Sequence, residues 1–166
     1  MKISTRFMTQ AAIIAALYAA ITSIFIYTSF GTFNALQVRV SEALTLLPML
    51  SPAAVPGLFV GCLLANLIGM GVGITSIIDV VIGPVVTLLA ALLTRKLRKH
   101  PLLAALPPVL LNAIYVGWFL TYIVQLGTPF WVNVGWTALG QFAACYLFGF
   151  VLLWALRKLP QDTFAL

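Results

Sequence analysis

The sequence predicts an all-α integral membrane protein, a single domain over residues 1–166 with six transmembrane helices and both termini in the cytoplasm. The chain is 63% hydrophobic with a mean hydropathy of +1.12, whereas a soluble domain is about 45–50% apolar. A helical span needs about 20 apolar residues, so 166 residues hold about six spans and short loops. The basic residues cluster at the ends of apolar segments, as topology signals do.

Proline, glycine and charged residues divide the chain into segments at about 7–28, 37–50, 55–71, 77–94, 102–123 and 132–156. The first follows Lys2 and Arg6, as the apolar part of a secretory signal would. Its apolar run is longer than that of a signal, and no convincing small-residue cleavage site follows it. We therefore expect a retained first helix. The second segment is short and is flanked by Pro48 and Pro52.

Small residues repeat at helical spacing in two segments. The first segment has an alanine face at Ala12, Ala16 and Ala20, and the third has a glycine row at Gly57, Gly61, Ala65 and Gly69. Such faces let helices approach closely in lipid. For the glycine row we favour packing inside the protein. For the alanine face, internal packing and a partner site are both open.

The last three segments contain further polar and helix-breaking residues. Asp79 lies near the start of the fourth segment. Pro107 and Pro108 predict that the fifth is kinked or that its regular part starts one turn late.

The positions of the basic residues predict the orientation. With cytoplasmic termini, all of the nine Lys and Arg residues except Arg39 fall on the cytoplasmic side: Lys2, Arg6, Arg95, Lys96, Arg98, Lys99, Arg157 and Lys158. This agrees with the positive-inside rule. Asn112 then lies near mid-membrane, and most other polar and aromatic residues gather in the outer half: Arg39, Glu42, Asp79, Tyr115, Trp118, Phe119, Tyr122, Trp131, Asn133, Trp136 and Gln141.

Arg39, Glu42 and Asp79 are the only charged residues between Phe7 and Thr94. A charge at bilayer depth costs about 2.5–3.5 kcal/mol on insertion scales and usually marks a functional site. Arg39 and Glu42 are three residues apart and can pair on one helical face, either as a structural ion pair or as part of a site. Two acids and one base favour a ligand that carries N–H donors or a positive charge.

An aromatic stripe on the fifth segment forms a second candidate feature. Asn112 and Tyr115 continue into Phe119 and Tyr122 at helical spacing, with Trp118 beside them. The stripe is either core packing or a stacking surface for a flat, polar, aromatic ligand.

Several function classes lack a signature in the sequence. There is no phosphate-binding loop, no HExxH and no GxSxG, so we expect no catalytic site and no ATP hydrolysis by this chain. Cys62 and Cys145 have no metal or redox spacing, and we expect no metal and no cofactor. The net charge of +6 comes from helix ends, so nucleic acid is not an expected partner.

Three motifs resemble the QueT family. They are LQVRVSEALTLLP at 36–48, PAAVPGLFVGC at 52–62 and IDVVIG at 78–83. The resemblance covers nearly the whole chain, with a minor departure at Pro84, where Ser is expected.

The resemblance implies the substrate-binding subunit, or S-component, of an energy-coupling factor (ECF) importer in a bacterial cell membrane. It implies a six-helix S-component bundle that opens outward and works with a membrane T-component and two cytosolic ABC ATPases. The cargo would be a queuosine precursor, a flat 7-deazaguanine-type base. This cargo fits the site that the residues themselves predict, at Glu42, Asp79, Arg39, Asn112, Tyr115 and Trp118. The T-component would dock on Ala12, Ala16 and Ala20.

Two alternatives stay open from the residues alone. One is an S-component for another vitamin, since pocket residues choose the cargo. The other is a stand-alone proton-coupled carrier or small channel in which Glu42 and Asp79 relay protons.

Overall fold

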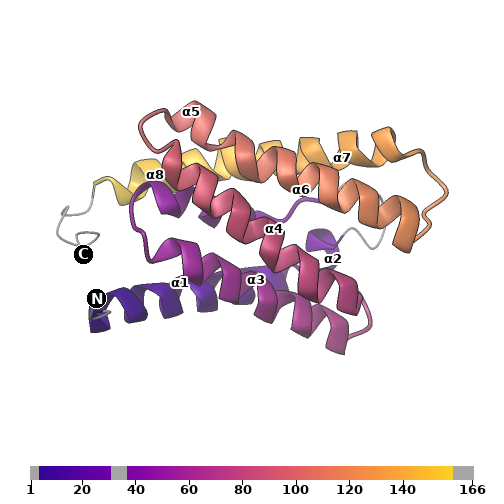
Figure 1. The fold of residues 1–166 in the computed structure, drawn as a ribbon, viewed down its shortest axis with the longest axis horizontal. Coiled ribbons are helices and arrows are strands. Elements are labelled where there is room, and N and C mark those ends of the chain that lie inside the picture. The colour runs from indigo at the N-terminus through magenta and orange to yellow at the C-terminus, as the bar shows by residue number, and fades with distance from the viewer. Residues whose placement is uncertain (1–3, 31–36, 159–166) are drawn as a thin grey trace.

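The apolar segments fold as helices that lie along one another in a bundle (Figure 1). The computed structural model describes residues 4–30 and 37–158. Five helical stretches in these ranges are long and apolar enough to cross a membrane: Thr5–Ile24, Ala54–Gly71, Ile77–Lys96, Pro101–Ile123 and Phe130–Leu156. The predicted count of six spans and their topology stay predictions.

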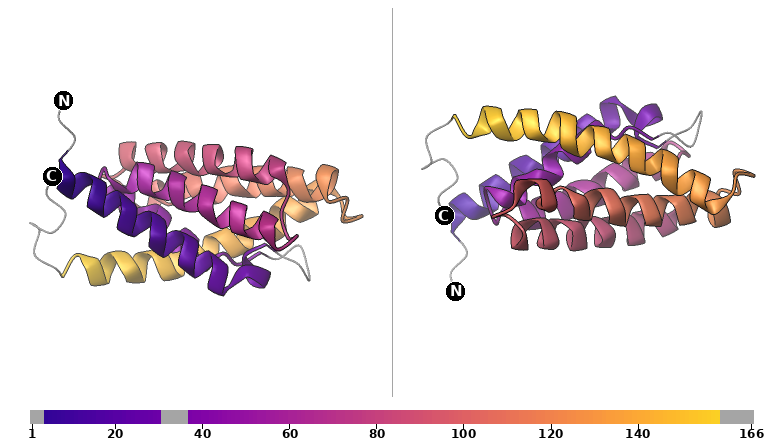
Figure 2. Two further views of the ribbon diagram at one scale, coloured as in Figure 1. Left: turned by 90° about the horizontal axis from the view of Figure 1, so that it is seen from below. Right: turned by 90° about the horizontal axis from the view of Figure 1, so that it is seen from above.

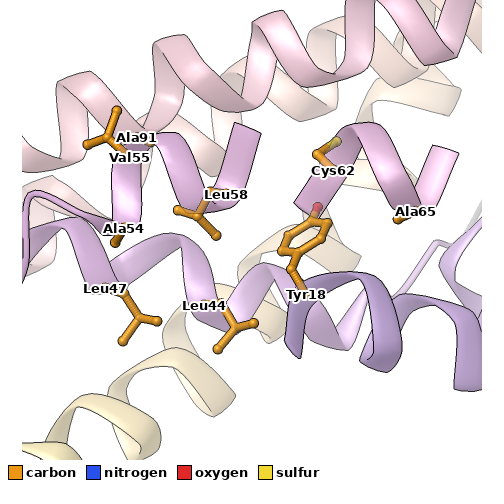
Figure 3. Close-up of a cluster of buried hydrophobic side chains, with 9 residues drawn as sticks. All are labelled: Tyr18, Leu44, Leu47, Ala54, Val55, Leu58, Cys62, Ala65 and Ala91. Carbon is orange, nitrogen blue, oxygen red and sulfur yellow. The ribbon is translucent and has the colours of Figure 1, made fainter. Parts of the chain in front are cut away.

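The first helix packs tightly against the third segment. Helix α1 (Thr5–Ile24) is followed by a single turn, α2 (Ile26–Ser29), and α3 (Ala54–Gly71) lies beside α1. A Cβ atom at Gly57 would lie 2.8 Å from the Ala11 carbonyl oxygen, and one at Gly61 would lie 2.8 Å from Tyr18 Cβ. Only glycine permits this approach, so the predicted internal role of these two glycines is confirmed. Around them, Tyr18, Leu58 and Cys62 form part of a buried apolar cluster (Figure 3).

The second predicted helix differs from the expectation. It is a 3₁₀ helix, η1 (Val40–Met49), whose residues from Ser41 to Met49 are all buried. Its bonds join residues three apart, as in Glu42 N–H to the Arg39 carbonyl at 2.9 Å. At ~2.0 Å per residue it spans about 20 Å, less than the ~30 Å of a hydrocarbon core. The sequence segment at 37–50 thus forms a short central helix.

The fourth and fifth segments agree more closely with prediction. Helix α4 (Ile77–Lys96) leads through a turn to α5 (Pro101–Ala104), α6 (Leu106–Trp118) and the π-helical η2 (Phe119–Ile123). Helix α6 begins with its prolines in the first turn, where a missing N–H costs no helical bond. The predicted late start is therefore confirmed.

The last segment is interrupted by a second π-helical stretch. Helix α7 (Phe130–Phe142) continues through η3 (Ala143–Gly149) into α8 (Phe150–Leu156). A Cβ at Gly149 would lie 2.8 Å from Leu46 Cδ1, so η3 and the 3₁₀ helix η1 are in close contact.

The basic residues of the described ranges, apart from Arg39, gather at one end of the bundle. The start of α1, the end of α8 and the turn between α4 and α5 all lie there (Figures 1 and 2). These elements carry Arg6, Arg95, Lys96, Arg98, Lys99, Arg157 and Lys158. Lys2, which the sequence placed with them, lies outside the described residues.

Candidate functional site

Glu42 lies in the first turn of η1 and is completely buried. Its Oε1 accepts a hydrogen bond from the Tyr18 hydroxyl at 2.6 Å, and its Oε2 accepts one from Asn112 Nδ2 at 3.2 Å. Arg39 Nη1 lies 3.9 Å from Oε1. Donors from α1, α6 and the segment before η1 therefore converge on one carboxylate, which compensates for its loss of water.

Arg39 is held in place by more than Glu42. Its Nε donates to the Ser29 carbonyl at 3.4 Å, and its guanidinium lies 4.6 Å from the centre of the Phe30 ring. A guanidinium over an aromatic face is attracted by the ring quadrupole. These contacts fix the cation beside the acid that the sequence paired with it.

Asp79 lies in the first turn of α4, and its Oδ1 accepts a hydrogen bond from the Tyr115 hydroxyl at 2.8 Å. Asn66 Nδ2 donates to the Asp79 carbonyl at 2.8 Å. A Cβ at Gly83 would lie 2.6 Å from Asn66 Nδ2 and 3.1 Å from Asp79 Oδ1, so glycine leaves room for both side chains. Within the described ranges, Asp79 Oδ2 has no hydrogen-bond partner.

Helix α6 joins the two acids into one site. Asn112 and Tyr115 are three residues apart and share a helical face; one bonds to Glu42 and the other to Asp79. Arg39, Glu42 and Asn112 are thus linked by direct contacts, as are Asp79 and Tyr115, and the two groups meet on one face of α6. The sixth predicted site residue, Trp118, packs its ring 6.4 Å from that of Tyr115, is 37% exposed, and contacts neither acid.

The site lies in the half of the bundle away from the basic end. Asp79 is in the first turn of α4, whereas Arg95 and Lys96 are in its last turn. At ~1.5 Å per residue, Asp79 and Arg95 are about 24 Å apart along the axis.

This arrangement resembles a ligand-binding site more than a catalytic one. The described residues offer carboxylate acceptors, a cation and aromatic rings, which are groups that can hold a polar ligand. No group of three or more His, Cys, Asp or Glu in residues 4–30 and 37–158 could hold a metal ion.

The family model of the QueT transporter matches residues 8–158. The chain belongs to the QueT transporter family. As a QueT transporter it belongs to a transporter family and not to an enzyme family. No curated protein and no solved structure matched the chain.

Two of the three motifs that resemble the QueT family carry the charged residues of the site, and the other packs against α1. Within the described residues, the first reaches from Gln37 into η1 and contains Arg39 and Glu42. The second contains the start of α3, with Gly57 and Gly61. The third contains the start of α4, from Ile78 to Gly83, with Asp79.

Sequence reasoning missed two buried residues of this candidate site, Tyr18 and Asn66. Both are fully buried, and each bonds to one of the acidic residues. Polar groups inside apolar helices need partners, so a lone Tyr in an alanine-rich helix and a lone Asn in a glycine-rich one were available signals. Their partners lie on other helices, which the sequence alone does not pair.

Proposed function

We propose that this chain is the S-component of an ECF-type importer in a bacterial cell membrane, capturing a queuosine precursor of the 7-deazaguanine class from the outer face. The observation that carries the proposal is the pair of buried acids, Glu42 and Asp79, joined through neighbouring residues of α6. Membership of the QueT family supports a small-molecule cargo.

The chemistry of the cargo matches these acids. A 7-deazaguanine ring carries a ring N–H beside an exocyclic amine, and one carboxylate can accept both in a bidentate pair. Asp79 has the more open acceptor, because its Oδ2 has no partner among the described residues. Both carboxylate oxygens of Glu42 already accept a hydrogen bond. Glu42 is therefore better suited to an additional, positively charged donor, such as the amine that some precursors carry.

The proposed orientation places the site toward the outside. With six spans, η1 in the second, and cytoplasmic termini, the basic end of the bundle faces the cytoplasm under the positive-inside rule. The acids then lie in the outer half, where an importer meets its cargo.

The energy would come from other subunits. Two cytosolic ABC ATPases would act through a T-component, which docks on the alanine face of α1. Ala12, Ala16 and Ala20 lie on the exposed side of that helix, whereas Ala15 and Ala19 are buried. An exposed row of small residues allows another helix to approach closely.

Uptake measured in cells tests this function. We expect import of a 7-deazaguanine-type base to stop on ATP depletion and to persist when an uncoupler removes the proton gradient, and we expect the chain to co-purify with ATPase subunits. Loss of import with the uncoupler alone would instead indicate a proton-coupled carrier. Import of a different vitamin and not of the base would indicate another S-component cargo.

A further inference from the structure

Among the described residues, five buried side-chain oxygens have no hydrogen-bond partner: Ser29 Oγ, Asn66 Oδ1, Ser76 Oγ, Thr137 Oγ1 and Gln141 Oε1. Such atoms are rare in folded proteins, and each calls for an explanation. Three of them belong to residues near the charged residues of the site. The backbone carbonyl of Ser29 accepts a hydrogen bond from Arg39 Nε, Asn66 Nδ2 donates to the backbone carbonyl of Asp79, and Ser76 precedes the first turn of α4. The other two lie on α7, which the site described above does not include.

Thr137 and Gln141 lie one turn apart on the buried face of α7 and are 0% and 3% exposed. The antiparallel packing of α6 and α7 gives their level in the bundle. Gly117 packs directly on Val134, and Asn133 Nδ2 donates to Thr121 Oγ1 at 2.9 Å.

Continuing this register along both helices sets Thr137 level with Tyr115 and Gln141 level with Asn112. Each unpartnered oxygen is therefore level with the α6 residue that bonds to one of the two acids.

Contacts of α7 with η1 and with the chain before it locate Gln141 independently of the register between α6 and α7. At Gly140 the backbone of α7 touches the chain before η1 so closely that a Cβ would overlap the Gln37 carbonyl oxygen. One turn beyond Gln141, Cys145 Sγ lies 3.7 Å from the Glu42 carbonyl oxygen. Gln141 is between these two contacts, and hence beside the stretch of chain that contains Arg39 and Glu42.

We propose that Thr137 and Gln141 form a third wall of the cargo site and bind the polar edge of the base that the acids cannot bind. This inference rests on the proposed function and deepens it. Ionised carboxylates only accept hydrogen bonds, so they leave the ring carbonyl of a lactam without a donor. A glutamine amide supplies an N–H donor for this carbonyl, whereas the ring N–H next to the carbonyl is the one that a carboxylate accepts. The threonine hydroxyl supplies one more donor or acceptor.

The test combines calorimetric titration of the purified protein with 7-deazaguanine and thermal unfolding without ligand. Gln141→Leu should weaken binding about tenfold to a hundredfold, and Thr137→Val by a smaller factor, because each removes a hydrogen bond to a buried ligand. Without ligand, Thr137→Val should raise the Tm by ~2–4 °C, because it removes a buried hydroxyl that has no partner.

Thr94→Val is the matched control. Thr94 is also fully buried, but its hydroxyl donates to the Ala104 carbonyl at 2.8 Å near the basic end of the bundle. This variant should lower the Tm and leave the affinity unchanged.

The outcomes separate the inference from the function on which it rests. If wild type binds the base and both α7 variants bind it equally well, the inference is wrong and the proposed function stands. If wild type binds no such base, both are wrong. A fall in the Tm of Thr137→Val comparable to that of Thr94→Val would show a structural hydroxyl and would also overturn the inference.

Discussion

At the residue scale, the site depends on how buried polar groups are satisfied. Glu42 has Tyr18, Asn112 and Arg39 around it, whereas Asp79 has one hydroxyl donor, Tyr115. An unmatched N–H or oxygen in a desolvated site costs about 1–3 kcal/mol. Asp79 therefore has more acceptor capacity left for hydrogen bonds to a ligand than Glu42 has.

Substitution of the acids should weaken cargo binding. Asp79→Asn keeps the shape but replaces an acceptor oxygen with a donor, so we expect affinity to fall by about tenfold to a few hundredfold. Glu42→Gln should act similarly, while Arg39→Lys should affect binding less or act through folding. Isothermal titration measures these effects. Near-wild-type affinity in both acid variants would reduce the residues to a structural cluster.

The sequence predicted the polar residues better than their partners. Charges in an apolar stretch single out Arg39, Glu42 and Asp79, because the bilayer makes any charge costly. Periodicity placed Asn112 and Tyr115 on one face of a helix. The bonds of Tyr18 and Asn66 depend on how helices pack, which a pattern within one segment does not contain.

At the element scale, the site combines regular α-helices (α1, α4 and α6) with the 3₁₀ helix η1. The 3₁₀ helix η1 packs against the π-helical η3, and a second π-helical stretch, η2, follows α6. Such stretches often occur at functional sites or hinges. Hydropathy indicates an apolar helix in each case. It does not distinguish a 3₁₀, α or π helix, whose backbone hydrogen bonds join residues three, four or five apart. That choice is made by packing, so the sequence predicted an ordinary helix at 37–50.

At Gly140, α7 packs so closely on the chain before η1 that there is no room for a side chain. Gly140→Ala would overlap the Gln37 carbonyl, push the Arg39 segment away from α7 and weaken cargo binding by about tenfold or more. Gly135→Ala is the control on the same helix, since a Cβ there meets nothing within 4 Å. It should leave binding unchanged and raise stability by up to ~1 kcal/mol. Titration and thermal unfolding check both, and equal behaviour of the two variants would contradict the packing argument.

At the scale of the whole molecule, one end of the bundle is basic and the other half holds the acids. We predict that the basic end is cytoplasmic. The two native cysteines are buried, so Lys99→Cys introduces the accessible thiol. A membrane-impermeant maleimide should label it only after the cells are opened. Labelling in intact cells would mean that the basic end faces outward, and it would contradict both the predicted orientation and the outward-facing site.

The exposed alanine face provides a separate prediction about assembly. If Ala12, Ala16 and Ala20 contact a T-component, Ala16→Trp should block complex formation and uptake while leaving cargo binding by the isolated chain intact. Pull-down and titration of the same preparation measure the two effects. Loss of both together would mean that the substitution disturbs internal packing, and the assignment of the partner face would be wrong.

The most direct measurement is mass spectrometry of the ligand retained by the purified protein. It should be compared between wild type and a variant carrying both Glu42→Gln and Asp79→Asn. We predict that wild type retains a 7-deazaguanine-type base and that the double variant, folded to the same Tm within a few degrees, retains none. A retained compound of another class, or equal amounts of the base in both proteins, would contradict the central claim that these two buried acids bind a queuosine precursor.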